Sequence, residues 1–276
     1  MTGIDYDWEY NNRRRVPNAG AIIEGWKRSS APARTDHRPA RLDLAYGPAA
    51  THRIDLYEPE GGKDRPLILF IHGGYWQMLD KADFAFIAPP FTRLGARVAV
   101  VNHTLCPAIA MAGLVEEIRQ AAAWLYREFK TPLDVIGHSA GGHLTAMLAA
   151  VDWPAWAGDL PADLVRSGLS VSGLFDLEPL RHMYVNDALG LDAAEAKRQS
   201  PMFLTPKRVP PLVLAVGGLE GAEFHRQSED LAKAWQGRGS AIEVLDLPGR
   251  DHFTALDALI EPDHVLHQTA RRLIGV

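Results

Sequence analysis

Short, continuous apolar runs recur along this 276-residue chain, and longer helical patterns separate several of them. Runs of branched residues without polar alternation are typical of strands that are buried on both faces. Strands that alternate with helices predict a mostly parallel sheet with helices on both sides. The predicted buried strands are Leu67–Ile71, Val98–Val101, Leu133–Ile136, Leu169–Val171, Leu212–Val216 and Ile242–Leu245.

The segments before these strands follow a different pattern. Arg41–Tyr46 and Arg53–Tyr57 alternate apolar and polar residues, which predicts a half-buried antiparallel pair at one edge of the sheet. Residues 1–40 are irregular apart from a weak helical pattern over 17–34, and we treat them as an N-terminal extension. Because large α/β units run to about 250 residues, we expect a single domain over residues 1–276.

One long segment interrupts the alternation of strands and helices. Residues 176–210 lie between two predicted strands, carry several prolines and exceed an ordinary crossover connection in length. Long insertions in compact domains are often binding loops, so we predict a small lid here. A plain surface excursion is the alternative.

The most informative motif is Gly137–His138–Ser139–Ala140–Gly141. It follows a predicted strand directly and precedes a predicted helix, which is the context that a G-x-S-x-G nucleophile elbow requires. Glycines allow the sharp turn, and the helix N-terminus favours negative charge near the serine. Ser139 is therefore the predicted nucleophile, the alternative being a glycine-rich turn with an idle serine.

A second glycine motif follows the first predicted buried strand. Gly73 and Gly74 come after His72 and precede two aromatic residues, Tyr75 and Trp76. Glycines let backbone N–H groups point into a crevice without side-chain obstruction. With the amide of Ala140, these groups predict an oxyanion hole.

A base and an acid are expected downstream of the nucleophile. Of the two, the acid comes first along the chain and the histidine, which is the base, comes second. His252 lies on the loop after the last predicted strand, from which it can reach the serine. Glu220 lies between glycines at the end of the preceding strand and is the favoured acid over Glu223, Asp246 and Asp251.

Composition and charge exclude several classes of protein. The chain carries 29 Lys and Arg against 34 Asp and Glu, a net charge of −5 that argues against nucleic-acid binding. Its longest apolar runs fall far short of the roughly 18 residues of a membrane span. The single cysteine, Cys106, permits no intrachain disulfide, and the start of the chain is unlike a signal peptide, so we expect a cytoplasmic protein.

These motifs together resemble the α/β-hydrolase fold, and within it the arylformamidase (kynurenine formamidase) family. The resemblance extends in order from about residue 45 to the last predicted helix and includes stretches outside the predicted catalytic loops. Its matching stretches are Ile54–Tyr57, His72–Gln77, Gly137–Gly141, Val171–Gly173, Asp176–Leu180, Glu223–Ser228 and Asp251–Phe253.

The resemblance implies hydrolysis of a small acyl amide or ester, with formyl as one such group, through an acyl-serine and without metal or cofactor. It assigns the base to His252 and the acid to position 220, where the family has Asp and this chain has Glu. Tyr75, Trp76 and Tyr184 are predicted to offer aromatic surface to the substrate, with core packing as the alternative.

Three other functions remain open at this point. Relatives of the family include general carboxylesterases and thioesterases of short acyl chains. A non-catalytic binding protein on the same fold is less favoured, because all three predicted catalytic residues are present. A metal site built from His72, His138, His143 and His252 lacks a recognisable ligand spacing. The partner expected is a small molecule, and the sequence leaves open whether the chain forms a homodimer.

Overall fold

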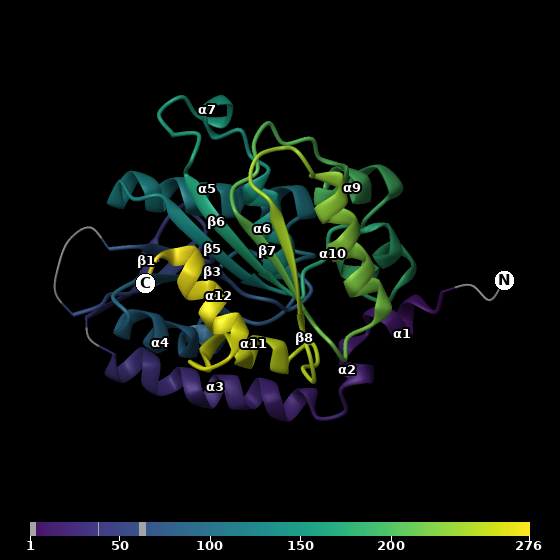
Figure 1. Cartoon of the computed structure of the whole chain (residues 1–276), viewed down its shortest axis with the longest axis horizontal. Coiled ribbons are helices and arrows are strands. Elements are labelled where there is room, and N and C mark those ends of the chain that lie inside the picture. Colours follow the sequence, from purple (N-terminus) through teal and green to yellow (C-terminus); the bar gives the residue numbers. More distant parts are fainter. Residues whose placement is uncertain (1–3, 38, 61–64) are drawn as a thin grey trace.

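A single eight-stranded sheet runs through the centre of the computed structural model (Figure 1), which describes residues 4–37, 39–60 and 65–276. The strand order is β1-β2-β4-β3-β5-β6-β7-β8. The first two strands pair antiparallel to each other, and β2 pairs antiparallel to β4; the other pairs are parallel. The strands are β1 (Ala40–Ala45), β2 (Arg53–Tyr57), β3 (Leu67–Ile71), β4 (Arg97–Val101), β5 (Leu133–His138), β6 (Val165–Val171), β7 (Leu212–Gly217) and β8 (Ile242–Leu247).

This arrangement confirms the predicted mostly parallel sheet with an antiparallel pair at one edge. Strand β3 shows why its sequence contains no polar alternation. Leu67, Leu69 and Ile71 pack in one apolar cluster, whereas Ile68 and Phe70 pack in another. Since successive side chains of a strand point to opposite faces, both faces of β3 are buried and every position must be apolar.

Helices cover the two faces of the sheet, as Figure 1 shows. Residues of α3, α4, α11 and α12 share the cluster on one face, and residues of α5 and α6 share the cluster on the other. Helix α10 packs beside β7 and β8. These helices are α3 (Ala19–Asp36), α4 (Ala88–Arg93), α5 (Met111–Phe129), α6 (Ala140–Ala149), α10 (Ala222–Ala234), α11 (Thr254–Asp257) and α12 (Val265–Ile274). The shorter helices η1 (Lys81–Ile87), α7 (Trp153–Trp156) and η4 (Ala258–Ile260) lie in the connections.

The N-terminal extension is more ordered than its sequence predicts. It forms α1 (Tyr6–Tyr10), α2 (Asn12–Arg15) and the long helix α3, which continues through Pro32. The helical pattern over residues 17–34 is therefore confirmed by α3, whereas the expectation of an irregular segment was wrong for the residues of α1 and α2. The weak helical pattern reflects an amphipathic helix of which one side, including Ile23 and Trp26, packs against the domain. Tertiary contacts stabilise such a helix more than its intrinsic propensity does.

The segment of residues 176–210 is a chain of short helices rather than an extended loop. It follows β6 and contains η2 (Glu178–His182), α8 (Asn186–Leu189), α9 (Ala193–Arg198) and η3 (Pro201–Phe203). Its first helix contacts α1, and Tyr6 stacks on His182 with 6.1 Å between the ring centroids. Among the described residues, no helix is long and apolar enough to cross a membrane.

The turn from β5 to α6 is so tight that two of its positions have no room for a side chain. A methyl group on Gly141 would lie 1.9 Å from the carbonyl oxygen of Ile71. A methyl group on Gly137 would lie 2.0 Å from the carbonyl oxygen of Gly141. Both contacts are with backbone atoms, so relief would require α6 to move away from the sheet.

We therefore predict that Gly141→Ala lowers the free energy of unfolding by at least about 3 kcal/mol, the upper range for overpacking in a core. Urea denaturation followed by circular dichroism measures this change. Gly158→Ala is the matched control, because no atom lies within 4 Å of a methyl group there. Equal stability of the two variants would contradict the predicted clash.

Candidate active site

Ser139 lies at the point where β5 ends and α6 begins. Its φ of 57° and ψ of −117° are rarely adopted by residues other than glycine. Two backbone hydrogen bonds hold this conformation, from Ser139 N to Val171 O at 2.8 Å and from His143 N to Ser139 O at 3.1 Å. The neighbouring elements thus stabilise the conformation that presents the Ser139 side chain beyond the end of the strand.

His252 and Glu220 complete a chain of hydrogen bonds to this serine. His252 Nε2 lies 3.0 Å from Ser139 Oγ, and His252 Nδ1 lies 2.7 Å from Glu220 Oε2. The three residues come from the loops after β5, β7 and β8, which end at the same edge of the parallel sheet. All three are buried, so their interactions are only weakly screened by water.

The Glu220 carboxylate is held by two further donors. Gly217 N donates to Glu220 Oε1 at 2.7 Å, and Ser172 Oγ donates to the same oxygen at 2.6 Å. Ser172 has a φ of 55°, another strained position beside the site. These bonds aim the second oxygen at His252, which would then keep its proton on Nδ1 and present Nε2 to the serine. No motif in the sequence marks Ser172 for this role.

The glycine loop after β3 turns sharply beside Ser139. His72 Nδ1 lies 2.8 Å from Gly73 O, to which it donates when the buried ring is neutral. Because a trans peptide directs its C=O and N–H to opposite sides, the Gly74 N–H points away from His72. Gly74 has a φ of 117°, and a methyl group there would lie 2.2 Å from Met78 O. Among the described residues, no hydrogen bond engages the amides of Gly74 and Ala140.

Two other histidines near the serine hold neighbouring segments in place. His138 Nε2 lies 2.8 Å from the backbone oxygen of His252 and holds that loop in place. His143 Nε2 lies 2.7 Å from Gln199 O and ties α6 to the segment of residues 176–210. Burial lowers the pKa of His138 to about 3 and that of His143 to about 4, so both rings are neutral at pH 7.

Two of the other acids considered from the sequence have different partners. Glu223 accepts hydrogen bonds from Tyr10 and Arg226, and Asp251 caps the turn before α11 through Phe253 N and Thr254 N. In the described part of the chain, no cluster of three or more His, Cys, Asp or Glu residues is arranged to hold a metal ion.

A cavity of about 170 Å³ opens beside Ser139. This is below the ~300–1,000 Å³ that is usual for small-molecule sites, so the cavity suits a small substrate. Most of its wall is apolar or aromatic, and part of that wall comes from the N-terminal extension. The lining residues are Asn12, Arg13, Ile23, Trp26, Gly73, Gly74, Tyr75, Met78, Leu79, His138, Ser139, Tyr184, His252 and Phe253.

The three aromatic residues expected to contact substrate lie in different places. Tyr75 and Tyr184 line the cavity, and Tyr184 is half exposed. Trp76 lies instead in the core, 1% exposed, with its ring edge-on to His143 at 5.1 Å. For Trp76, therefore, the alternative of core packing holds, because the turn directs its side chain into the core rather than into the cavity.

Most of the cavity wall has no direct signal in the sequence. Asn12, Trp26, Met78 and Phe253 are distant from one another along the chain, and none lies in a motif that marks a binding site. Phe253 follows His252 directly, so its adjacency to the predicted base was the one available clue.

This arrangement and the fold define an α/β-hydrolase with a serine, a histidine and a carboxylate in contact. The family model described as BD-FAE matches residues 54–154. Kynurenine formamidase of Danio rerio is 32% identical over 242 residues, which cover 85% of this chain and 82% of that protein. Kynurenine formamidase of Salmo salar is 31% identical over 264 residues, which cover 92% and 87% of the two chains.

The chain therefore belongs to the kynurenine formamidase family of α/β-hydrolases, as its motifs predicted, and it is a hydrolase. A solved structure with a similar backbone is that of a presumed thioesterase from Silicibacter sp. TM1040. It is 29% identical, has a TM-score of 0.85, and the match covers 99% of this chain and 100% of that one.

The buried, neutral His143 predicts loss of stability in acid. The unfolded state binds a proton at this residue below about pH 6.5, whereas the folded state, whose pKa is about 4, does not. The unfolded state therefore binds more protons between these values, and stability falls as the pH falls.

Between pH 7 and pH 5, we expect the wild type to lose about 2 kcal/mol more of its free energy of unfolding than His143→Gln does. Glutamine retains a donor for Gln199 O but does not titrate. Urea denaturation at the two pH values measures the difference. The same loss in both proteins would show that His143 does not take up this proton.

Proposed function

We propose that this chain is a serine hydrolase of small acyl amides or esters, with formyl amides of aromatic amines as its favoured substrates. The single observation that carries the proposal is the unbroken hydrogen-bonded chain from Glu220 through His252 to Ser139. A hydroxyl in contact with an imidazole that is oriented by a carboxylate is the arrangement used for nucleophilic acyl transfer.

In the proposed mechanism, Ser139 Oγ attacks the carbonyl carbon of the substrate while His252 Nε2 takes the hydroxyl proton. Glu220 stabilises the imidazolium that forms. The amides of Gly73, Gly74 and Ala140 bind the oxyanion, each donor contributing about 3 kcal/mol by analogy with other hydrolases. His252 then protonates the leaving nitrogen or oxygen. Water, deprotonated by His252, releases the acid from the acyl-serine.

The preference for a formyl group rests on the small cavity and on the family. A volume of about 170 Å³ beside the serine suits a compact acyl group, and the aromatic rings of Tyr75 and Tyr184 suit an aromatic leaving group. Both relatives described above are kynurenine formamidases. The replacement of the family's Asp by Glu220 leaves the carboxylate in contact with His252.

A second candidate is a thioesterase or carboxylesterase of short acyl chains. The 29% identity to the Silicibacter protein over nearly the whole chain favours it. We further propose that residues 176–210, which carry Tyr184, act as a lid of this single domain. A cytoplasmic location suits the lone, buried Cys106.

Replacement of the proposed nucleophile tests the mechanism. We expect Ser139→Ala to lower kcat by about 10⁴-fold or more, because the members of such a triad act as a unit. The hydrolysis of p-nitrophenyl acetate measures this loss. Ser170→Ala is the control, since its buried hydroxyl makes no hydrogen bond among the described residues, and it should retain activity. Activity of Ser139→Ala near that of the wild type would exclude a serine mechanism.

A matched substrate panel tests the acyl and leaving-group preference. Formanilide, acetanilide and butyranilide are compared with the p-nitrophenyl esters of the same acids. We expect kcat/KM to fall from formyl to butyryl, because each added methylene must enter the small cavity. Turnover of esters without any turnover of formanilide would favour the second candidate.

A further inference from the structure

The N-terminal extension contributes two polar residues to a cavity wall that is otherwise largely apolar. Asn12 and Arg13 belong to α2 and line the cavity that contains Ser139. On the same wall lie the apolar side chains of Ile23, Leu79 and Phe253. A few polar groups on an apolar wall are what orient a small ligand in most binding sites.

Arg13 differs from its two arginine neighbours in its lack of an acidic partner. Arg14 Nη1 lies 3.2 Å from Asp7 Oδ2, and Arg15 Nη1 lies 3.9 Å from Glu9 Oε1. Within residues 4–37, 39–60 and 65–276, Arg13 forms no ion pair, and its Nη2 donates only to Met78 Sδ at 3.5 Å. Thioether sulfur is a weak acceptor, so the charge of Arg13 remains available at the cavity wall.

Asn12 is 4% exposed, and its Nδ2 has no hydrogen-bond partner in the described structure. A buried donor without an acceptor costs about 1–3 kcal/mol, and such groups are rare in folded proteins. A ligand oxygen bound at this wall would satisfy it. Two adjacent residues thus offer unfilled hydrogen-bond donors, one of them charged.

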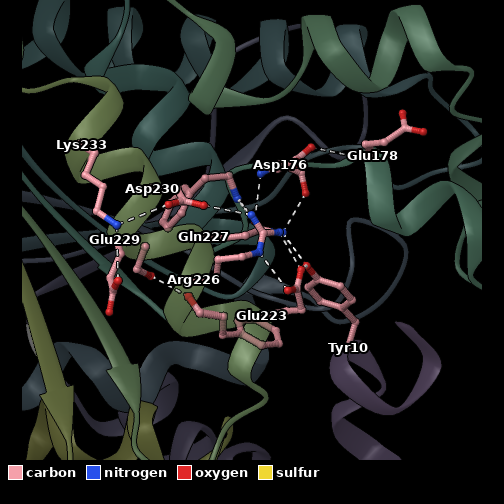
Figure 2. Close-up of polar contacts among 12 residues, drawn as sticks. Tyr10, Asp176, Glu178, Glu223, Arg226, Gln227, Glu229, Asp230 and Lys233 are labelled. Atoms are coloured by element: carbon pink, nitrogen blue, oxygen red, sulfur yellow. Dashed lines mark hydrogen bonds and ion pairs between the residues drawn. The ribbon is translucent and has the colours of Figure 1, made fainter. Parts of the chain in front are cut away.

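The helix that carries these residues is held firmly by Tyr10, two positions before Asn12. Figure 2 shows the Tyr10 hydroxyl among the polar side chains of α10. It donates to Glu223 Oε2 at 2.8 Å and accepts from Gln227 Nε2 at 2.7 Å. Tyr75 Oη, from the glycine loop, donates to the backbone oxygen of Tyr10. Residues that are positioned before a ligand arrives lose less entropy on binding.

We propose that Asn12 and Arg13 form a subsite for a carboxylate on the leaving group of the substrate. A guanidinium offers two parallel N–H donors that match the two oxygens of a carboxylate. The aromatic part of the leaving group packs on the apolar wall between this subsite and Ser139. The subsite rests on the proposed function for its place in the reaction, but its affinity for a carboxylate does not depend on turnover.

The experiment measures binding of 4-oxo-4-phenylbutanoate to the whole chain by isothermal titration calorimetry. This probe has an aromatic ring, a carboxylate and no hydrolysable bond. Its neutral counterpart is 1-phenylpentane-1,4-dione, in which a methyl ketone replaces the carboxylate. We expect the wild type to bind the carboxylate at least about tenfold more tightly, a difference that one charge-assisted hydrogen bond provides.

Arg13→Met should reduce this preference to within about twofold, because Met retains the apolar stem of the side chain. Arg14→Met is the matched control: it removes the same charge from the adjacent, exposed residue and should keep the preference. Asn12→Asp, which preserves the shape of the side chain, should weaken carboxylate binding by charge repulsion. Thermal unfolding of each variant checks that the fold is retained.

The subsite is overturned if the wild type shows no preference for the carboxylate or binds neither compound. It is equally overturned if Arg13→Met keeps the preference, or if Arg14→Met loses it to the same extent, which would indicate long-range charge alone. Since the probe is not hydrolysed, these results are independent of the Ser139→Ala test. A carboxylate preference with an inactive serine would disprove the proposed reaction but not the subsite.

Discussion

The close approach of α6 to the sheet is the constraint on which the rest of the site depends. Without Cβ atoms at Gly137 and Gly141, the helix begins against the backbone of β3, and Ser139 must adopt its strained conformation. That conformation directs the hydroxyl beyond the strand ends, where loops from β7 and β8 bring Glu220 and His252. A parallel sheet makes this meeting possible because its strands end at one edge.

The N-terminal extension closes the site from the other side. Tyr10 joins α1 to α10 through hydrogen bonds with Glu223 and Gln227. Its backbone oxygen also accepts a hydrogen bond from the hydroxyl of Tyr75 in the glycine loop. One residue thereby connects the extension, the loop with the proposed oxyanion donors, and the helix that follows the acid. The contacts of Tyr10 with Glu223 and Gln227 in Figure 2 therefore support the active-site wall.

The sequence predicted the sheet, and it also singled out the three residues that the structure brings into contact, because local patterns mark them. Buried strands such as Leu67–Ile71 need apolar residues at every position, and a strand–Gly-x-Ser-x-Gly–helix pattern fits few other turns. The helices α1 and α2, the full length of α3 and the burial of Trp76 were not predictable in this way. The helix α3 is stabilised by distant partners, and the direction of Trp76 depends on how the loop turns after Gly74.

The sequence by itself determined the fold class, the family and which serine, histidine and carboxylate are proposed to react, since each follows from residue type and chain order. Only the tertiary structure decided that Ser172 and Gly217 hold Glu220, that Tyr75 faces the cavity while Trp76 does not, and that Asn12 and Arg13 line it. These facts depend on contacts between segments far apart in the chain. No local pattern records such contacts, because the free energy that selects them arises when the segments pack together.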